Sequence, residues 1–445
     1  MTRSHHSGVY TMTRPLQKSL TASSLIKAVY EKFLKIPDSR SFDRKPKIAL
    51  VDHLMTGLAI FGLKFPSLLQ YDRKRENPEI GSNLKNLYHV QRPPSDTYLG
   101  ERLDEVDPSH LRPAFKKLFS QLQRSKKLEN FEFLDGHYLL SLDGTGEFSS
   151  GNISCPHCCK KEHKSGKVTY YHQMLGGCIV HPEQSNVIPL CPEMIHNVDG
   201  NTKNDCEKNA AKRFMEHFRR EHPHLKVIVI EDGLSSNAPH VKTLEQHNAK
   251  YILGAKQGDH KYLFELMDSS DSTRYFEMKD ERGYLHQFRF INNVSLNKTH
   301  REVKVNFWEY RETTPQGKEL NFSWVSNIHI TEKNIFNLTK GGRARWKIEN
   351  ETFNALKNLG YNFRHNYGHG KEHLSAVFCL LMILAFLIDQ IQEIACVLFR
   401  AAKKCAGGSY RGLWEELRVL FRHIVMNSWE ELYQKIAKIP LQDTS

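Results

Sequence analysis

The chain has 445 residues and a mass of 51.7 kDa, which at roughly 150 residues per domain predicts about two to four structural units. Lys and Arg number 63 against 50 Asp and Glu, so the formal net charge is +13 and the pI is near 9.1. With 39% hydrophobic residues and a mean hydropathy of −0.55, the composition excludes a protein made mostly of membrane spans and a disordered chain. The basic excess favours a polyanionic partner, most often nucleic acid.

The basic excess is concentrated at the start of the chain. Residues 1–130 hold 23 Lys and Arg against 13 Asp and Glu. Three stretches there have apolar residues at helical spacing, separated by the turn-rich ENPEIGSN and QRPPSDTY: SLIKAVYEKFLKI, DHLMTGLAIFGLKF and SHLRPAFKKLFSQL. We expect a basic helical N-terminal domain that binds DNA; a solvated basic surface on a scaffold domain is the alternative.

From residue 131 to 259, apolar strand patterns alternate with amphipathic helices. HYLLSLD predicts a strand that ends at Asp143, and LKVIVIED predicts a doubly buried strand that ends at Asp232. TYYHQMLGGCIVHP and NVIPLCPEMI add strands, DCEKNAAKRFMEHFRREH and APHVKTLEQHN are helices, and AKYILGAK is another strand. The order β-β-β-α-β-α-β predicts an α/β domain with a mixed sheet.

The second half of the chain divides into three further segments. Short alternating stretches in 260–340 predict a β-rich insertion. Residues 341–390 hold the helix GRARWKIENETFNALKNLG and the longest apolar run, AVFCLLMILAFLI. That run of thirteen residues is too short to span a bilayer, so we expect a buried helix and no membrane partner. Residues 391–445 predict a helical C-terminal region.

Cellular location follows from the termini and the cysteines. The first residues, Met1–Thr13, are polar and lack the apolar centre of a signal peptide. The nine cysteines are odd in number and lie in a long chain. We therefore expect no disulfide framework and a cytoplasmic protein.

Three carboxylates occur next to or within apolar segments, where a negative charge is costly to bury. Asp143 and Asp232 each end an apolar strand, where α/β sheets place their sites, although Asp is also a common turn residue. Gly144-Thr145-Gly146 is expected to open the turn after Asp143. Glu349 shares a predicted helical stripe with Trp346, Phe353 and Leu356. A carboxylate there needs a partner, either Arg345 one turn away or a bound cation.

Clustered carboxylates repel one another unless a counter-ion joins them. Mg²⁺ prefers a few carboxylate oxygens and keeps sites for substrate phosphates. A pair of such ions supports phosphoryl transfer. A basic chain with such a site is suited to phosphodiester chemistry.

At these residues the sequence resembles the DDE transposases of bacterial insertion sequences, in the group with a β-rich insertion between the second Asp and the Glu. The matching pieces are LSLDGT, VIVIEDG and RWKIENETFNALK, and the three acidic residues are 89 and 117 positions apart. The resemblance covers roughly residues 131–390.

The resemblance implies an RNase H-like core, a mixed sheet flanked by helices, in which Asp143, Asp232 and Glu349 hold two Mg²⁺ ions that Mn²⁺ can replace. It implies cleavage of double-stranded DNA at the inverted repeats of a mobile element and strand transfer into target DNA. It also implies a dimer or higher assembly in the bacterial cytoplasm, on the nucleoid when bound to DNA. The alternatives are a decayed or domesticated DNA-binding regulator, a metal-dependent nuclease on the same core, and a zinc-dependent hydrolase.

The family pattern around the glutamate is Tyr-x-x-Arg-x-x-x-Glu-x(6)-Lys, and this chain departs from it twice. Arg345 matches, but Gly342 stands in place of Tyr, and Lys357 comes eight residues after Glu349 instead of seven. These departures indicate a divergent subgroup. Arg345 and Lys357 are DNA-contact candidates.

Other DNA-contact candidates follow from the same resemblance. Arg364, His365, His369 and Lys371 are candidates for phosphate contacts, the alternative being a polar loop that caps the next helix. Trp308 and Trp324 in the insertion are candidates for stacking on a flipped base, the alternative being core residues.

A cysteine cluster follows the first predicted strand. The spacing Cys155-Pro-His-Cys158 supplies half of a zinc site, and zinc needs four ligands. We expect a structural zinc on Cys155, Cys158 and two of Cys159, His163 and Cys178; His172 also lies downstream. Free thiols in a loop or hairpin are the alternative.

Overall fold

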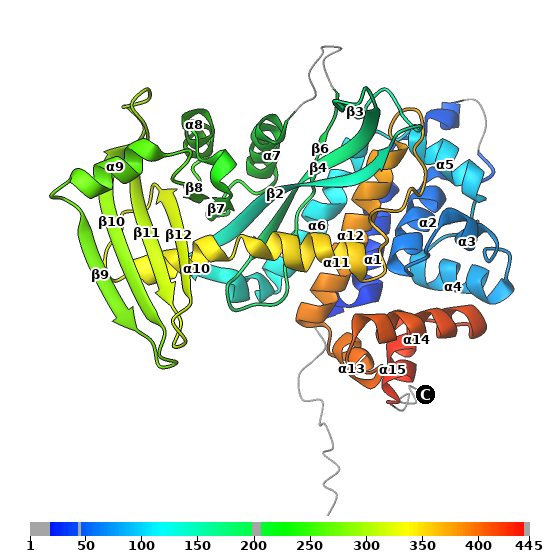
Figure 1. Ribbon diagram of the computed structural model, residues 1–445. Coiled ribbons are helices and arrows are strands. Elements are labelled where there is room, and N and C mark those ends of the chain that lie inside the picture. Colours follow the sequence, from blue (N-terminus) through cyan, green and yellow to red (C-terminus); the bar gives the residue numbers. More distant parts are fainter. Residues whose placement is uncertain (1–17, 43–45, 198–205, 440–445) are drawn as a thin grey trace, which may run out of the picture.

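A mixed sheet of 12 strands runs through the centre of the computed structural model, which describes residues 18–42, 46–197 and 206–439. The strand order is β3-β4-β2-β7-β8-β12-β11-β10-β9. Helices cover both faces of its central part, and a helical body made from both ends of the chain lies beside it (Figure 1). One contiguous apolar core joins these parts.

The core of the sheet is mixed, as the strand and helix order predicts, and has the RNase H-like arrangement that the resemblance implies. β2 (His137–Ser150) pairs antiparallel with β4 (Val168–Val180) on one side and parallel with β7 (Val227–Glu231) on the other. β8 (Lys250–Gly254) continues parallel to β7. Three short strands complete this part of the sheet, β5 and β6 against β4, and β1 against β2: β1 (Glu132–Leu134), β5 (Ile188–Pro189) and β6 (Glu193–Ile195).

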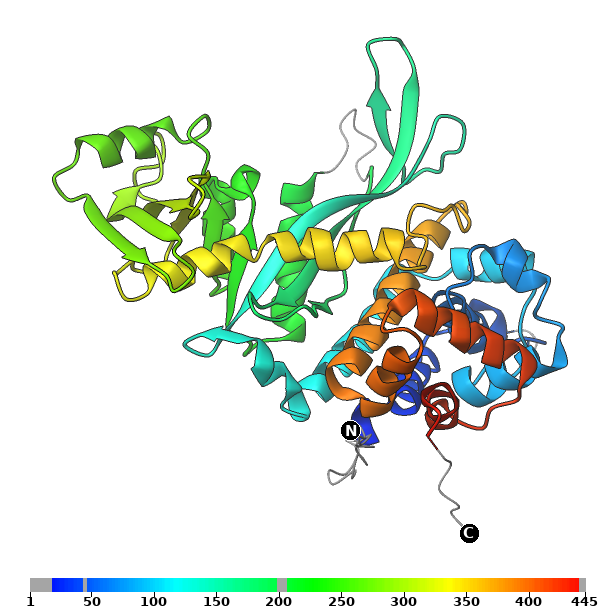
Figure 2. The same cartoon turned by 60° about the horizontal axis from the view of Figure 1, so that its bottom comes forward.

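The first core strand is longer than predicted. β2 does not end at Asp143, and Gly144 pairs with Leu175 inside the strand instead of opening a turn. The long hairpin with β4 is the reason, because it satisfies the backbone groups on one side of β2 as far as Ser150. β3 (Cys159–Glu162) pairs with the start of β4, and together these strands form an arm that projects from the core (Figure 2).

Two adjacent glycines in β4 allow helices to pack closely on both faces of the sheet. A Cβ atom at Gly176 would press on the ring of Phe353, and one at Gly177 would press on the ring of Phe214. Phe214 belongs to α7 (Glu207–Glu221), and Phe353 belongs to the helix that carries Glu349. The pair therefore explains why β4 contains LGGC at a fully buried position.

The predicted β-rich insertion extends the core sheet through β12, which pairs antiparallel with β8. Its strands form a meander that contains four members: β9 (Arg274–Lys279), β10 (Leu285–Ser295), β11 (Lys304–Thr313) and β12 (Glu319–Ser326). A helix that the strand pattern did not predict, α9 (Lys261–Ser269), precedes them. The insertion is thus continuous with the core sheet by backbone pairing.

Helices from both ends of the chain pack around α12 (Leu374–Ala395) (Figure 2). The N-terminal ones are α1 (Ala22–Phe33), α2 (Leu50–Gly62), α3 (Leu68–Asp72), α4 (Pro78–Tyr88), α5 (Asp96–Asp104) and α6 (Arg112–Arg124). The C-terminal ones are α13 (Val397–Cys405), α14 (Tyr410–His423) and α15 (Trp429–Ala437). Segments far apart in sequence therefore build one body.

One stretch that we expected to be turn-rich is helical. ENPEIGSN begins α4, where the side chain of Asn77 accepts a hydrogen bond from Ile80 N and Pro78 occupies the first turn. Asn and Pro are common in turns, but they are equally suited to the cap and first position of a helix.

The helix α12 is long and apolar enough to cross a membrane, but its residues from Leu374 to Gln392 are buried inside the protein. Its Asp389 accepts hydrogen bonds from Lys64 Nζ and from the hydroxyl of Tyr361, each at 2.6 Å. The Lys64 ammonium also lies 4.0 Å from the centre of the Tyr361 ring. These contacts tie α12 to the residues that follow α2.

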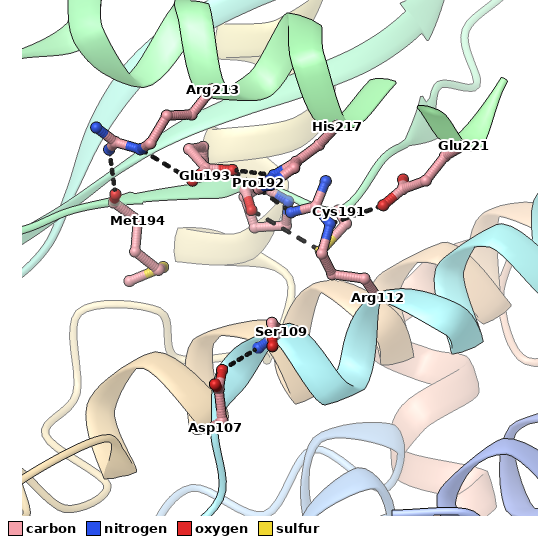
Figure 3. A network of polar contacts seen from close by, with 10 residues as sticks. All are labelled: Asp107, Ser109, Arg112, Cys191, Pro192, Glu193, Met194, Arg213, His217 and Glu221. Carbon is pink, nitrogen blue, oxygen red and sulfur yellow. Dashed lines mark hydrogen bonds and ion pairs between the residues drawn. The ribbon is translucent and has the colours of Figure 1, made fainter. Parts of the chain in front are cut away.

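A second polar network fastens the helical body to the core (Figure 3). Glu193 of β6 accepts hydrogen bonds from Arg213 Nε at 3.1 Å and Arg112 Nη1 at 3.4 Å, and His217 Nδ1 lies 3.0 Å away. Arg112 also donates to Glu221 at 2.7 Å. Because Arg112 belongs to α6 and the other side chains belong to β6 and α7, the network fixes how the body sits against the sheet.

Replacing one partner of the buried Lys64–Asp389 pair is expected to destabilise the protein strongly. Lys64→Met should lower the free energy of unfolding by about 3–5 kcal/mol, because Asp389 is left buried without its cation. Lys242→Met, which breaks the exposed pair with Glu302, should leave the free energy of unfolding almost unchanged, because water screens this pair. Denaturant unfolding of both variants provides the measurement, and equal effects would contradict this account.

Candidate active site

The parallel pairing of β2 and β7 sets the positions of the two aspartates. In this ladder Ser141 lies opposite Ile230, so two residues further along each strand Asp143 and Asp232 come to the same level. Alternation along a strand puts these aspartates on the face of Ser141 and Ile230. Asp232 follows the end of β7, and its Oδ1 accepts a hydrogen bond from Leu234 N at 3.0 Å.

Glu349 reaches the same place on a helical run that crosses the molecule from the β-rich insertion to the helical body (Figure 1). The run starts with α10 (Ile335–Arg343), continues through a π-helical segment (Ile348–Phe353) and ends with α11 (Asn354–Asn358). The hydroxyl of Ser141 donates to the carbonyl of Arg345 at 3.2 Å. This bond anchors the run to β2 two residues before Asp143.

Arg345 bridges two of the carboxylates. Its Nη1 lies 3.3 Å from Asp143 Oδ2 and 2.9 Å from Glu349 Oε1. The pairing of Glu349 with Arg345, one of the two partners left open by the sequence, is therefore present.

The expected burial pattern around Glu349 is wrong in part. Phe353 and Leu356 are buried, but the Trp346 side chain is 51% exposed and Glu349 is 36% exposed. A turn at Ala344–Arg345 and the π-helical segment interrupt the 3.6-residue period on which the prediction rested. Trp346 instead lies at the surface, with the Arg345 guanidinium 4.6 Å from its ring centre.

The environment of Asp143 disfavours its charge. Burial raises the pKa of Asp143 to about 7, Arg345 acts to lower it, and the neighbouring Glu349 raises it further. A carboxylate in this position is stabilised by additional positive charge. The oxygen-rich donor set of Asp143, Asp232 and Glu349 thus fits a hard divalent cation.

A fourth carboxylate, Glu207, was missed by the sequence analysis. It begins α7, lies against Gly144 and accepts a hydrogen bond from Gln173 Nε2 at 2.7 Å. Burial raises the pKa of Glu207, and the charge of Asp232 adds to this shift. The sequence offered little signal, because its stretch has the pattern of an ordinary amphipathic helix.

Both departures from the family pattern have a structural explanation. A Cβ atom at Gly342 would lie 2.6 Å from Trp324 Nε1, so no Tyr side chain fits there. A π-helical turn holds one residue more than an α-helical turn, which accounts for the extra residue between Glu349 and Lys357. Burial and Arg364 lower the pKa of Lys357, while Glu349 and Asp143 act in the opposite direction. Lys357 therefore lies near Glu349 and Asp143, and Arg364 lies near Lys357.

The remaining predicted DNA-contact residues fall into two groups. Arg364, His365 and Lys371 are exposed in the loop between α11 and α12. Trp308 and Trp324 are only 0% and 5% exposed, and Trp308 Nε1 donates to Thr339 Oγ1. The base-stacking prediction is wrong for both tryptophans, because they form the core between β11, β12 and α10.

The cysteine cluster contains two of the four predicted zinc ligands. Cys155 and Cys158 meet His172 of β4 and His369 of the loop before α12, with all four ligand atoms within 4.8 Å of one another. Hydrogen bonds from Cys158 and His172 lower the pKa of Cys155. Cys159 and Cys178 are buried elsewhere, beside Ile195 O and Thr352 Oγ1 respectively. His163 lies beside Thr169.

The corrections at this cluster have separate physical causes. Cys159 is the first residue of β3, and its side chain points to Ile195 O instead of to the cluster. Cys178 lies six residues further along β4 than His172, so it is too far along the strand to join the cluster. The participation of His369 could not be read from spacing, since it lies 211 residues from Cys158.

Removing the charge of Asp143 is expected to stabilise the metal-free protein above about pH 7. Because the pKa of Asp143 is higher in the folded chain than its ordinary value of 3.8, folding stability falls as pH rises from about 4 to about 7. Asp143→Asn should remove this penalty, raising the unfolding free energy by roughly 1–2 kcal/mol at pH 8. Thermal unfolding without metal at pH 4 and pH 8 tests this, and an equal or lower stability of the variant at pH 8 contradicts it.

Comparison with known proteins identifies the family. The sequence profile described as "Transposase DDE domain" matches residues 155–387; the match contains Asp232 and Glu349 and begins after Asp143. A comparison with curated proteins finds no significant match. Among solved structures, the chain is similar to a piggyBac transposase in a synaptic complex with hairpin DNA, at 12% identity and a TM-score of 0.38, over 96% of this chain and 85% of that chain. Because the profile covers more than half of the 445 residues, the chain belongs to the transposase DDE domain family, as its resemblance to the DDE transposases predicted.

Proposed function

We propose that this protein is an active DNA transposase in which Asp143, Asp232 and Glu349 hold two Mg²⁺ ions, which Mn²⁺ can replace. The observation that supports the proposal is the bridge that Arg345 makes between Asp143 and Glu349. The register of β2 and β7 adds Asp232, because it brings this residue to the level of Asp143 on the neighbouring strand. Bound in pairs, such ions stabilise the attacking and leaving oxygens of phosphoryl transfer.

Side chains around the carboxylates would position the metal ligands and the DNA phosphate. Arg345 holds the carboxylates of Asp143 and Glu349 toward each other. Lys357 supplies positive charge near Glu349 and Asp143, and Arg364 lies near Lys357, where a DNA phosphate would be bound. Exposed Trp346, stacked on Arg345, offers a flat surface beside the same phosphate.

The proposed reaction has two steps at one site. A water molecule hydrolyses a phosphodiester at the end of the mobile element and leaves a free 3′-hydroxyl. That hydroxyl then attacks a phosphodiester of target DNA, so one bond is formed as another is broken. We further propose that two or more copies act together on the inverted repeats, in the bacterial cytoplasm and on the nucleoid, with the basic N-terminal helices contributing DNA contacts.

Neutralising any one of the three carboxylates is expected to abolish DNA cleavage and strand transfer while DNA binding persists. Asp143→Asn, Asp232→Asn and Glu349→Gln are the informative variants, and Glu351→Gln, two residues from Glu349 on the same helix, is the matched control that should retain activity. The assay uses end-containing DNA with Mg²⁺ or Mn²⁺ and separates nicked from joined products. Wild-type cleavage by any of the three variants would refute their assignment. Nicking without joined products would identify a nuclease, and binding without nicking by the wild type would identify a regulator.

Lys357 and its neighbour Arg364 are expected to contact DNA phosphates. Lys357→Ala and Arg364→Ala should each weaken DNA binding and reduce the slope of log affinity against log salt concentration by about 1. Lys438→Ala, at the end of α15 in the helical body, is the control and should leave the slope unchanged. Binding isotherms at several salt concentrations give the slopes, and an unchanged slope for both test variants would exclude direct phosphate contacts.

A further inference from the structure

We propose that Cys155, Cys158, His172 and His369 form a structural zinc site that fastens the projecting β-arm to the loop before α12. This site is separate from the carboxylates of the proposed active site and goes beyond the proposed function. Its four ligands come from three segments: the turn before β3, strand β4 and the loop between α11 and α12.

Four of the six distances among the ligand atoms match a tetrahedral zinc centre, and all six are within 4.8 Å. With Zn–S bonds of about 2.3 Å and Zn–N bonds of about 2.0–2.1 Å, a tetrahedron has S–S edges of about 3.8 Å and S–N edges of about 3.5 Å. The two sulfurs are 3.8 Å apart, and His172 Nε2 lies 3.4 Å from each of them. His369 Nε2 lies 3.3 Å from the sulfur of Cys158.

The surroundings also favour a metal over an ordinary hydrogen-bonded cluster. Cys158 and His172 are 0% and 2% exposed, so water has little access to them. The Nδ1 atoms of His172 and His369 are buried without a hydrogen-bond partner among the described residues. Both rings therefore direct Nε2, their one atom with polar neighbours, at the two sulfurs.

Two thiols and two imidazoles select zinc over the hard ions that suit the carboxylate site. Four protein ligands leave no open position for water or substrate, which is typical of structural sites. The inferred ion therefore takes no direct part in phosphoryl transfer.

The fastening role of the zinc site follows from the other contacts of the loop between α11 and α12. The hydroxyl of Tyr367 donates to Phe65 O at 2.7 Å, and Asp104 of α5 accepts hydrogen bonds from the backbone N–H groups of residues 371–374. These contacts attach the loop to the helical body. Zinc on His369 attaches the same loop to the β-arm, and so fixes Arg364 and Lys371 relative to β2 and Asp143.

Zinc content of the full-length protein tests the site directly. Protein prepared without a metal-affinity tag should contain about one zinc per chain by elemental analysis. Cys155→Ser and His369→Ala should lose most of it, whereas the matched controls Cys159→Ala and His163→Ala should retain it. His369→Cys should restore binding, because it replaces one zinc ligand by another. Wild-type protein that binds no zinc even when zinc is supplied, or controls that lose zinc as the test variants do, would overturn the proposal.

The fastening role has its own readout, which does not depend on transposase activity. Chelation of zinc, or the His369→Ala substitution, should increase hydrogen exchange in residues 361–373 and in the β-arm while α12 stays protected. Cobalt substituted for zinc should give the visible absorption of tetrahedral sulfur and nitrogen coordination. Unchanged exchange in both segments after zinc loss would show that the ion does not fasten them.

Discussion

The parallel pairing of β2 with β7 is the constraint on which the rest of the site depends. Its register brings Asp143 and Asp232, which are 89 residues apart in the chain, to the same level on neighbouring strands. The antiparallel pairing of β2 with β4 extends the first strand beyond Asp143. Asp143 is therefore held in the middle of a rigid strand, while Asp232 stands just past the end of one. A shift of one residue in the β2–β7 register would turn one carboxylate to the opposite face.

The glutamate helix joins this pair through charge and packing together. Phe353 packs on the bare backbone of Gly176, and Ser141 holds the carbonyl of Arg345, so the helix approaches β2 and β4 closely. Arg345 then lies between Asp143 and Glu349 and offsets part of their repulsion. Burial, and to a smaller extent the charge of Glu349, still raises the pKa of Asp143 despite this guanidinium. This residual cost is what a divalent cation at the carboxylates would remove.

Outside the carboxylates, the molecule is held together by contacts between segments that are distant in sequence. The Lys64–Asp389 pair secures α12, and the Glu193 network secures α6 against α7 and β6 (Figure 3). The proposed zinc site would join the β-arm to the loop that follows the glutamate helix. The first contact lies within the helical body, and the other two connect this body or its loop to the sheet, so the position of the loop cations depends on the whole fold.

The sequence by itself determined most of the order of the elements and indicated three candidate carboxylates, because apolar periodicity and strand ends are local properties. It also indicated the β-rich insertion and half of the cysteine cluster, since CxxC is a local spacing. Only the tertiary structure decided the rest. The π-helical segment shifted the helical periodicity around Glu349 and accounts for the position of Lys357. Packing buried Trp308 and Trp324 and left Trp346 exposed. His369 joined Cys158 across 211 residues, and Glu207 reached Gly144 from another helix. Such contacts depend on how strands and helices pack in three dimensions, so they cannot be inferred from the periodicity of the sequence.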